Sequence, residues 1–163
     1  EGLRLIYPNL PIVYNDPSNL EARGKMLVGS CLAGISFLKG LGFVHAISHM
    51  VGAEFDTQHG LTNAIVLPSV LKYNRHVMDK KIPIMSEAMG LKKNDFDNFY
   101  QSFCNLLDQL EIPKNLKEIG VEASSVERLA EKALKDSAFA TNPRTASLEE
   151  MVDLINISMN KGR

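Results

Sequence analysis

The sequence predicts an all-α domain built from several helices, and three observations support this. Apolar residues recur at intervals of three and four residues through most of the chain. No stretch alternates apolar and polar residues in the way a half-buried strand does. Ser, Asp or Asn residues precede several of the periodic runs, as they do at helix N-termini. With 163 residues, of which 45% are hydrophobic and 23% charged, the chain is long enough to enclose the core of one domain.

The first part of the chain predicts two helices. The first covers residues 1–9, and we expect Pro11 to end it because proline disrupts a helix interior. For the second, Ser18 is the predicted N-cap and Glu21 completes a capping box. Small residues recur along this second helix, which indicates close packing against another helix; they are Ala22, Gly29, Ala33 and Gly34.

Two further helices and a short one are expected in the middle of the chain. The first covers residues 43–53 and is followed by a turn over residues 56–60. The next covers residues 61–78 and contains Pro68, which we expect to kink or reset it. The short helix covers residues 82–89 and is closed by Gly90.

The C-terminal part predicts three more helices. A strongly amphipathic helix is expected from Asn94, its N-cap, to the Ile112-Pro113 stop, with its aromatic stripe in the core. Ser124 or Ser125 is expected to cap the helix over residues 126–134. Ser147 is expected to cap the last helix, whose first turn carries Glu149 and Glu150, where the helix dipole favours negative charge.

Charge and composition weigh against several classes of function. With 18 Lys+Arg and 19 Asp+Glu the formal net charge is −1, so no broad basic surface is available for nucleic acid. No apolar run approaches the roughly 18–20 residues of a membrane span. No Gly-rich phosphate loop is visible, so this chain shows no nucleotide-binding unit. Cys31 and Cys104 cannot form a disulfide framework, and we expect buried thiols in a reducing cytoplasm.

The start of the chain is unusual. It reads EGLRLIYPNLP, with no initiator Met and no signal peptide. We expect the chain to be part of a longer polypeptide.

Three of the four histidines fall within fifteen residues, and their spacing suits a metal ion. His45 and His49 are four residues apart on a predicted helix and therefore share one face. His59 follows a turn containing Asp56, so imidazoles from two elements could meet. Pairs of the form H-x-x-x-H also occur by chance, and this one lacks the Glu of the H-E-x-x-H motif. The spacing alone therefore leaves core or surface histidines as the alternative.

A metal site usually needs more ligands than these. Glu54 and Asp56 are the nearest carboxylates, although Asp56 is more typical of a turn residue. His76 has no partner in the sequence and is expected on the surface. We expect Arg144 to anchor a loop by pairing with a carboxylate.

A longer pattern surrounds the histidines and resembles the iron-containing (group III) alcohol dehydrogenases. Its first part comprises Ala33-Gly34-Ile35-Ser36-Phe37, residues 39–49, Gly52-Ala53, residues 59–65 and Leu67-Pro68. Its second part comprises Ile112-Pro113, Asp136, Thr141-Asn142-Pro143-Arg144 and Leu148-Glu149. The resemblance covers nearly the whole chain, and the histidine motif, whose outer members are fourteen residues apart, is highly specific.

The resemblance implies a role for five residues of this chain. His45 and His59 match two of the family's four protein ligands to a divalent metal, usually Fe²⁺ and sometimes Zn²⁺. His49 matches a non-ligand histidine beside the nicotinamide and the substrate, which implies a catalytic and cofactor-binding role. Leu41 and Ala138 match positions of the substrate pocket. The family's other two ligands, an aspartate and a histidine, and its N-terminal α/β domain that binds NAD or NADP precede any residue of this chain.

The resemblance also implies a fold and an activity. Residues 1–163 are similar to the helical C-terminal domain of this dehydroquinate-synthase-like superfold, cut from an enzyme of roughly twice the length. The implied reaction moves a hydride from a small alcohol to the nicotinamide and yields an aldehyde or ketone. We expect the isolated chain to be inactive without its N-terminal domain and the whole enzyme to be a cytoplasmic homo-oligomer. A non-redox metal-binding or helical interaction module, or a relative of the glycerol dehydrogenase type, remains the alternative.

Overall fold

The computed structural model describes residues 1–160, which contain helices and no strand, so the all-α prediction is confirmed for them. The chain divides into two compact units, each made from two separate stretches of sequence. Unit 1 comprises residues 1–39 and 78–110. Unit 2 comprises residues 40–77 together with the chain from residue 111 onward.

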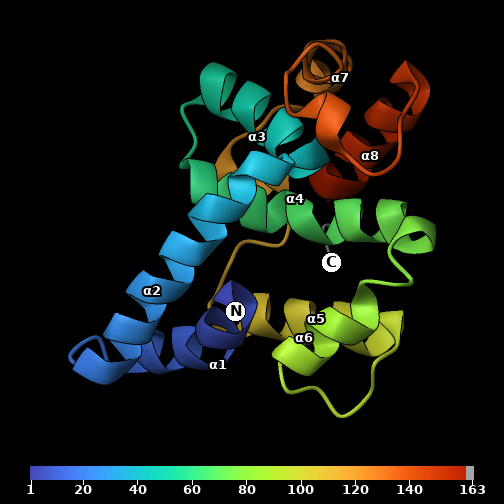
Figure 1. The fold of residues 1–163 in the computed structure, drawn as a ribbon. Helices are drawn as coiled ribbons and strands as arrows, with labels where there is room; N and C mark the ends of the chain where they lie inside the picture. Colours follow the sequence, from blue (N-terminus) through green and yellow to red (C-terminus); the bar gives the residue numbers. More distant parts are fainter. Residues whose placement is uncertain (161–163) are drawn as a thin grey trace. The chain divides into compact units, whose positions relative to one another are not determined.

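Unit 1 contains four α-helices among its described residues. The first two pack closely against each other (Figure 1). The elements of unit 1 are α1 (Gly2–Asn15), α2 (Leu20–Ser36), the short 3₁₀ helix η1 (Phe37–Lys39), α5 (Ile82–Ala88) and α6 (Phe96–Gln109). Gly29 of α2 lies against α1 so closely that an added Cβ would stand 2.7 Å from Cγ1 of Ile6. The expected close packing of α2 is therefore confirmed at Gly29, whereas Gly34 faces open space.

Several details of unit 1 differ from the prediction. The first helix does not end at Pro11 but continues through Pro8 and Pro11 to Asn15, because its packing on α2 outweighs the backbone hydrogen bonds that proline cannot donate. The N-cap of α2 is Asn19, whose side chain accepts the N–H of Ala22, whereas Ser18 donates its hydroxyl to Asp16.

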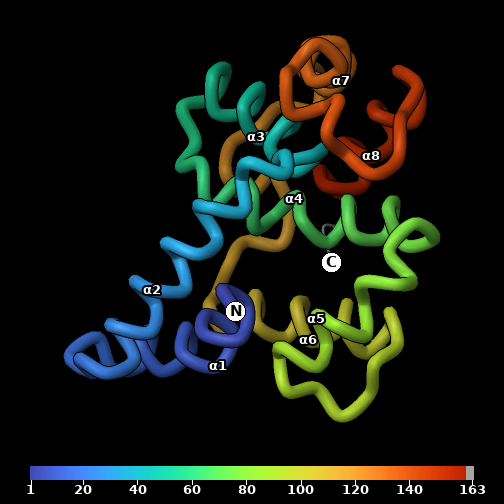
Figure 2. The backbone as a smooth tube through the Cα atoms, viewed as in Figure 1, coloured from blue at the N-terminus to red at the C-terminus, as the bar shows by residue number. Residues whose placement is uncertain are grey.

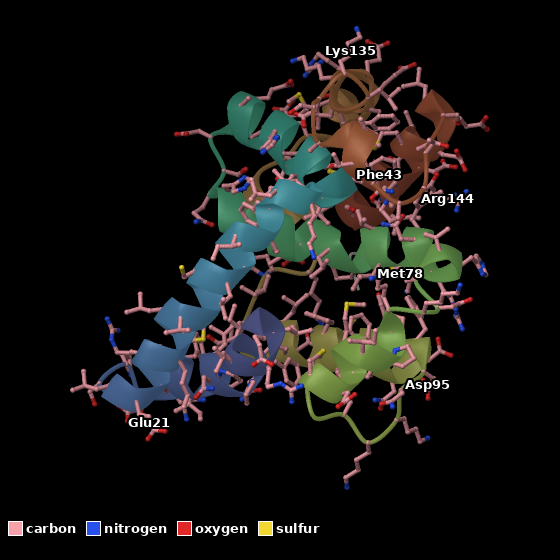
Figure 3. The ribbon with its side chains drawn as sticks, in the orientation of Figure 1. Glu21, Phe43, Met78, Asp95, Lys135 and Arg144 are labelled. Atoms are coloured by element: carbon pink, nitrogen blue, oxygen red, sulfur yellow. The ribbon has the colours of Figure 1, made fainter. Side chains whose placement is uncertain are left out.

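The two ends of α6 and the exposure of one cysteine of unit 1 also differ from the prediction. The N-cap of α6 is Asp95, labelled in Figure 3, and not Asn94, since the Asp95 carboxylate accepts the N–H of Asn98 at 2.8 Å. The helix ends at Gln109, before the predicted Ile112-Pro113 stop. Cys104 is buried as expected, whereas the prediction that Cys31 is buried is wrong, because Cys31 is exposed on α2.

Unit 2 brings two stretches of sequence together around a shared core (Figure 2). Residues 40–77 supply α3 (Gly42–Phe55), α4 (His59–Asn74) and the short helix η2 (Arg75–Val77). The later stretch supplies η3 (Leu116–Ile119), η4 (Ala123–Ser125), α7 (Val126–Ala133), η5 (Phe139–Thr141) and α8 (Leu148–Asn160). Helix α3 packs against α4 and α7, and α8 packs against α4 and α7.

The core of unit 2 is formed by fully buried apolar side chains from every one of its α-helices. Phe43 at the start of α3 is completely buried and stacks on Phe139 of η5, with 5.0 Å between ring centroids. The other large members of this core are Ile47, Ile65, Leu116, Leu129, Met151, Ile155 and Met159. This core holds α3 and α4, the two helices that carry the histidines, in a defined arrangement.

The helix boundaries in unit 2 follow the prediction to within a few residues, and the clearest differences concern α4 and the cap of α7. Helix α4 begins at His59 instead of residue 61 and ends at Asn74 instead of Met78, and it runs without a break through the buried Pro68. Ser125 occupies the N-cap position of α7, but its hydroxyl donates to the Glu122 carbonyl at 2.6 Å and caps nothing.

The predicted cap of the last helix is confirmed. Ser147 accepts the N–H of Glu150 through its hydroxyl at 3.2 Å, and the Glu150 carboxylate accepts the N–H of Ser147 at 2.9 Å. These two hydrogen bonds form a capping box.

Within residues 1–160 no single helix is both long and apolar enough to cross a lipid bilayer. The helical segments over residues 20–39 and 42–55 reach the length and apolar composition of a membrane span only if they are counted as one segment.

Candidate metal centre

The structure brings His45, His49 and His59 together on unit 2. Helix α3 carries the first two, and His59 is the first residue of α4. The three ring centroids are 5.2 to 5.7 Å apart. The predicted convergence of imidazoles from two elements is therefore present.

A reversal of the chain between α3 and α4 brings His59 to the other two. Asp56 ends α3 in the left-handed conformation, with φ of 51°, and its N–H donates to the Gly52 carbonyl. Gln58 then caps α4, because its side-chain oxygen accepts the N–H of Leu61. Asp56 is thus the turn residue that its type predicted.

The N-terminus of α3 is held by residues nearly one hundred positions further along the chain. The hydroxyl of Thr141 accepts the N–H groups of Leu41 at 3.0 Å and Gly42 at 3.1 Å. The side-chain oxygen of Asn142 accepts the N–H of Phe43 at 3.2 Å. Helix N-termini leave such N–H groups without intrahelical partners. These contacts therefore fix where α3 starts and how its histidine face is oriented.

Nε2 of His45 and Nε2 of His59 approach the same point. The amide nitrogen of Asn63 lies 3.4 Å from the first and 3.1 Å from the second. A single NH₂ group can donate to both rings only if both Nε2 lone pairs are directed at it. Two converging imidazole lone pairs are the donor set that a borderline divalent ion such as Fe²⁺ or Zn²⁺ prefers, so these two residues fit the expected metal.

The charge state of His45 suits metal binding. Burial lowers the pKa of His45, and the neighbouring His59 and His49 lower it further. A metal ligand must be the neutral imidazole, which a lowered pKa favours near neutral pH.

The described residues do not complete a metal site by themselves. Among residues 1–160 no group of three or more His, Cys, Asp or Glu side chains is arranged to hold an ion. The expectation that Glu54 is a nearby candidate ligand is wrong, because its carboxylate is bound to Arg128 and Lys132 of α7. Unit 2 therefore presents His45 and His59 as two candidate nitrogen ligands.

His49 has a partner that its sequence neighbourhood does not reveal. Its Nδ1 atom lies 3.1 Å from Oδ2 of Asp136, a residue in the segment after α7. Oδ1 of the same carboxylate accepts the N–H of Ala138 at 2.8 Å. In the sequence, Asp136 stands out only through the family resemblance, since a pair 87 residues apart leaves no local spacing signal.

Comparisons with known proteins agree with this geometry. The model of the Fe-containing alcohol dehydrogenase family, C-terminal part, matches residues 1–159. The chain belongs to this family. It is 36% identical over 154 residues to the "probable alcohol dehydrogenase EutG" of Escherichia coli (strain K12), with 94% of this chain aligned. It is 33% identical over 161 residues to the 1,3-propanediol dehydrogenase of Citrobacter freundii, again with 94% of this chain aligned.

A solved structure of the iron-containing alcohol dehydrogenase family shares the fold. A 1,3-propanediol oxidoreductase superposes with a TM-score of 0.93 at 32% identity, covering 97% of this chain and 43% of that chain. The two enzymes from Escherichia coli and Citrobacter freundii are covered over 39% and 42% of their lengths. The chain therefore spans about two fifths of the relatives it matches and corresponds to their C-terminal part.

Leu41 and Ala138, the two positions predicted to line the substrate pocket, are both hydrogen-bonded through their main chains to the hydroxyl group of Thr141. Thr141 accepts the N–H of Leu41 and donates its own hydrogen to the Ala138 carbonyl at 2.8 Å. Leu41 is half-buried and Ala138 is buried. The structure thus places both beside the start of α3, and their role in substrate binding stays a prediction.

The remaining predictions about site residues concern structural roles. His76 is exposed on η2, as expected. Arg144, labelled in Figure 3, pairs with Glu150 at 2.6 Å and lies 3.9 Å above the centre of the Tyr73 ring. The prediction that Arg144 anchors a loop through a carboxylate is therefore confirmed.

Proposed function

We propose that this chain is the metal-binding C-terminal part of an NAD(P)-dependent alcohol dehydrogenase. The observation that carries the proposal is the approach of Nε2 of His45 and Nε2 of His59 to one point. Membership of the Fe-containing alcohol dehydrogenase family supports it, as do the dehydrogenase activities in the names of its relatives. Small alcohols and the corresponding aldehydes or ketones are the proposed substrates, and the whole enzyme is proposed to be a homo-oligomer.

In this proposal His45 and His59 hold the metal, Fe²⁺ or Zn²⁺. The remaining ligands and the domain that binds NAD or NADP belong to the rest of the polypeptide, because this chain corresponds to about two fifths of its relatives. When bound, a divalent ion would lower the pKa of the alcohol hydroxyl, and a nicotinamide would serve as the hydride acceptor.

The residues of this chain orient the substrate and handle its proton. His49, held at Nδ1 by Asp136, would receive the hydroxyl proton of the alcohol on its other ring nitrogen. Leu41 and Ala138 would limit the size of the alcohol that fits. The position of α3 matters for both roles, and Thr141 and Asn142 fix its first turn.

Replacement of the two proposed ligands tests the metal site. We expect His45→Ala and His59→Ala, each made in the full-length protein, to lower the bound metal strongly and to reduce alcohol-dependent NAD(P) reduction by about 10²-fold or more. Metal is measured by elemental analysis after anaerobic loading with Fe²⁺. His76→Ala is the matched control, because His76 is an exposed histidine of the same unit.

Three outcomes would contradict the proposal. A double variant at His45 and His59 that keeps both metal and activity would contradict the ligand assignment. A wild-type protein that binds metal but oxidises no alcohol with NAD or NADP would contradict the dehydrogenase and favour a non-redox metal-binding module. Turnover by residues 1–163 alone would contradict the need for the rest of the polypeptide.

A further inference from the structure

The carboxylate of Asp136 is held in a fixed orientation beside His49. Its two oxygens have separate tasks, because Oδ2 faces Nδ1 of His49 at 3.1 Å and Oδ1 accepts the N–H of Ala138 at 2.8 Å. The backbone N–H of Asp136 donates to the Ala133 carbonyl at the end of α7. The Asp136 side chain is 12% exposed and that of His49 is 35% exposed, so the pair is largely shielded from solvent on the Asp136 side.

The same loop is attached to α3 at a second place. Three residues beyond Ala138, Thr141 and then Asn142 bind the first N–H groups of α3. The loop over residues 136–142 therefore contacts α3 at its N-terminus and again at His49, two helical turns further on. These two attachments determine the position of the Asp136 carboxylate relative to the His49 ring.

An ionised carboxylate can only accept hydrogen bonds, so it determines which nitrogen of His49 carries the hydrogen. Nδ1 must be the donor to Asp136, and in the neutral ring Nε2 then has the free lone pair. The opposite tautomer would place two lone pairs against each other at Nδ1.

We propose that Asp136 is a positioning residue that keeps His49 in the Nδ1–H tautomer and presents Nε2 as the proton acceptor for the substrate. The inference rests on the proposed function. In the oxidation of an alcohol, the O–H bond breaks and its proton forms the new N–H bond at Nε2. The C–H bond breaks with its electron pair, which passes as hydride to the oxidised nicotinamide. The resulting imidazolium is then paired with the Asp136 carboxylate.

The variant Asp136→Asn reverses this arrangement with little change in shape. If the Asn oxygen keeps the N–H of Ala138, its NH₂ group faces Nδ1 of His49 and requires a lone pair there. If the amide is rotated instead, its NH₂ group meets the N–H of Ala138, and two donors oppose each other. The backbone contact therefore favours the first orientation, in which His49 adopts the Nε2–H tautomer.

The experiment reads the tautomer directly. Full-length protein with ¹⁵N-labelled histidine side chains is loaded with diamagnetic Zn²⁺, and its NMR spectra are recorded at about pH 8.5, about two units above the ordinary histidine pKa. His49→Gln assigns the signals. We expect the Nδ1–H tautomer at His49 in the wild type and the Nε2–H tautomer in Asp136→Asn.

Kinetics and metal content complete the test. We expect kcat of Asp136→Asn to fall by about 10²–10⁴-fold. KM for the alcohol should change by less than about threefold, because the interaction acts in the transition state. The bound zinc should change little, since the Asp136 carboxylate is hydrogen-bonded to His49 and Ala138 and not to His45 or His59. Asp153→Asn is the matched control: Asp153 is exposed on α8, and its replacement should alter neither the tautomer nor kcat.

The outcomes separate this inference from the proposed function. An Nε2–H tautomer at His49 in the wild type would overturn the inference without reference to any variant. Two results for Asp136→Asn would also overturn the inference. One is that His49 keeps the wild-type tautomer, and the other is that the tautomer switches while kcat is unchanged. A tautomer switch in a protein that oxidises no alcohol would overturn the proposed function while the role of Asp136 in orienting His49 stands.

Discussion

At the scale of single residues, Glu54 shows how tertiary contacts remove a side chain from a site that lies next to it in sequence. It follows His49 by five positions on the same helix, yet its carboxylate binds Arg128 and Lys132 of α7. These two cations lower the pKa of Glu54 to about 2. The carboxylate therefore links α3 to α7.

The Glu54 contacts predict a dependence of stability on pH. Because the folded-state pKa is about 2 and the ordinary value is 4.5, the contribution is complete above about pH 4.5 and is lost as the pH falls toward about 2. Glu54→Gln should lower the thermal midpoint at about pH 7 and have a smaller effect at about pH 3, where part of the contribution is already lost. Glu131→Gln, at an exposed position of α7, is the control. An equal loss for Glu54→Gln at both pH values would contradict the assignment.

At the scale of elements, the structure explains why the small residues of α2 are not equivalent. Gly29 faces α1, where an added Cβ would stand 2.7 Å from Cγ1 of Ile6 and 3.2 Å from Cβ of Leu5. Gly24 of the same helix has no atom within 4 Å of such a Cβ. The periodicity indicated close packing somewhere along α2, but only the contact with α1 shows which glycine is needed.

These two glycines provide a matched pair of substitutions. Gly29→Ala should lower the free energy of unfolding by about 1–3 kcal/mol, because α1 and α2 must move apart. Gly24→Ala should raise it by about 0.5–1 kcal/mol, because alanine favours the helix at no steric cost. Urea denaturation followed by far-ultraviolet circular dichroism of the full-length protein measures both. A stabilised Gly29→Ala would show that α1 and α2 do not pack this closely.

At the scale of the whole molecule, the candidate site and the core that supports it belong to one unit. All three clustered histidines, their partner Asp136 and the clamp at the start of α3 lie in unit 2. None of the residues of unit 1 takes part in the contacts described for this site within residues 1–160. Metal binding should therefore stabilise the two units unequally.

Hydrogen exchange can test this unequal response. A ligand that binds only the folded site stabilises it by mass action. Addition of Zn²⁺ to the metal-free full-length protein should slow amide exchange in α3 and α4 far more than in α2. The same measurement on His59→Ala is the control and should show little change with the metal. Equal protection of α2 and α3 would contradict the placement of this chain's two proposed ligands in unit 2.

Helix existence was predictable from the sequence, whereas several helix ends were not. Apolar periodicity identified each α-helix because it reports which face is buried. The end of α1 was wrong because the rule that proline ends a helix ignores the packing of that helix on α2. The caps of α2 and α6 were wrong by one residue, since neighbouring Ser, Asn and Asp residues compete for the same N–H groups.

The sequence by itself determined the helical class of this protein, the histidine cluster and its resemblance to a family. These features depend on residue type and on spacings within one or two elements, where helix geometry is the same in every protein. Only the tertiary structure decided that Asp136 meets His49, that Thr141 and Asn142 clamp α3, and that Glu54 is bound to α7. The partners in these contacts are more than seventy residues apart, and packing around a shared core brings them together.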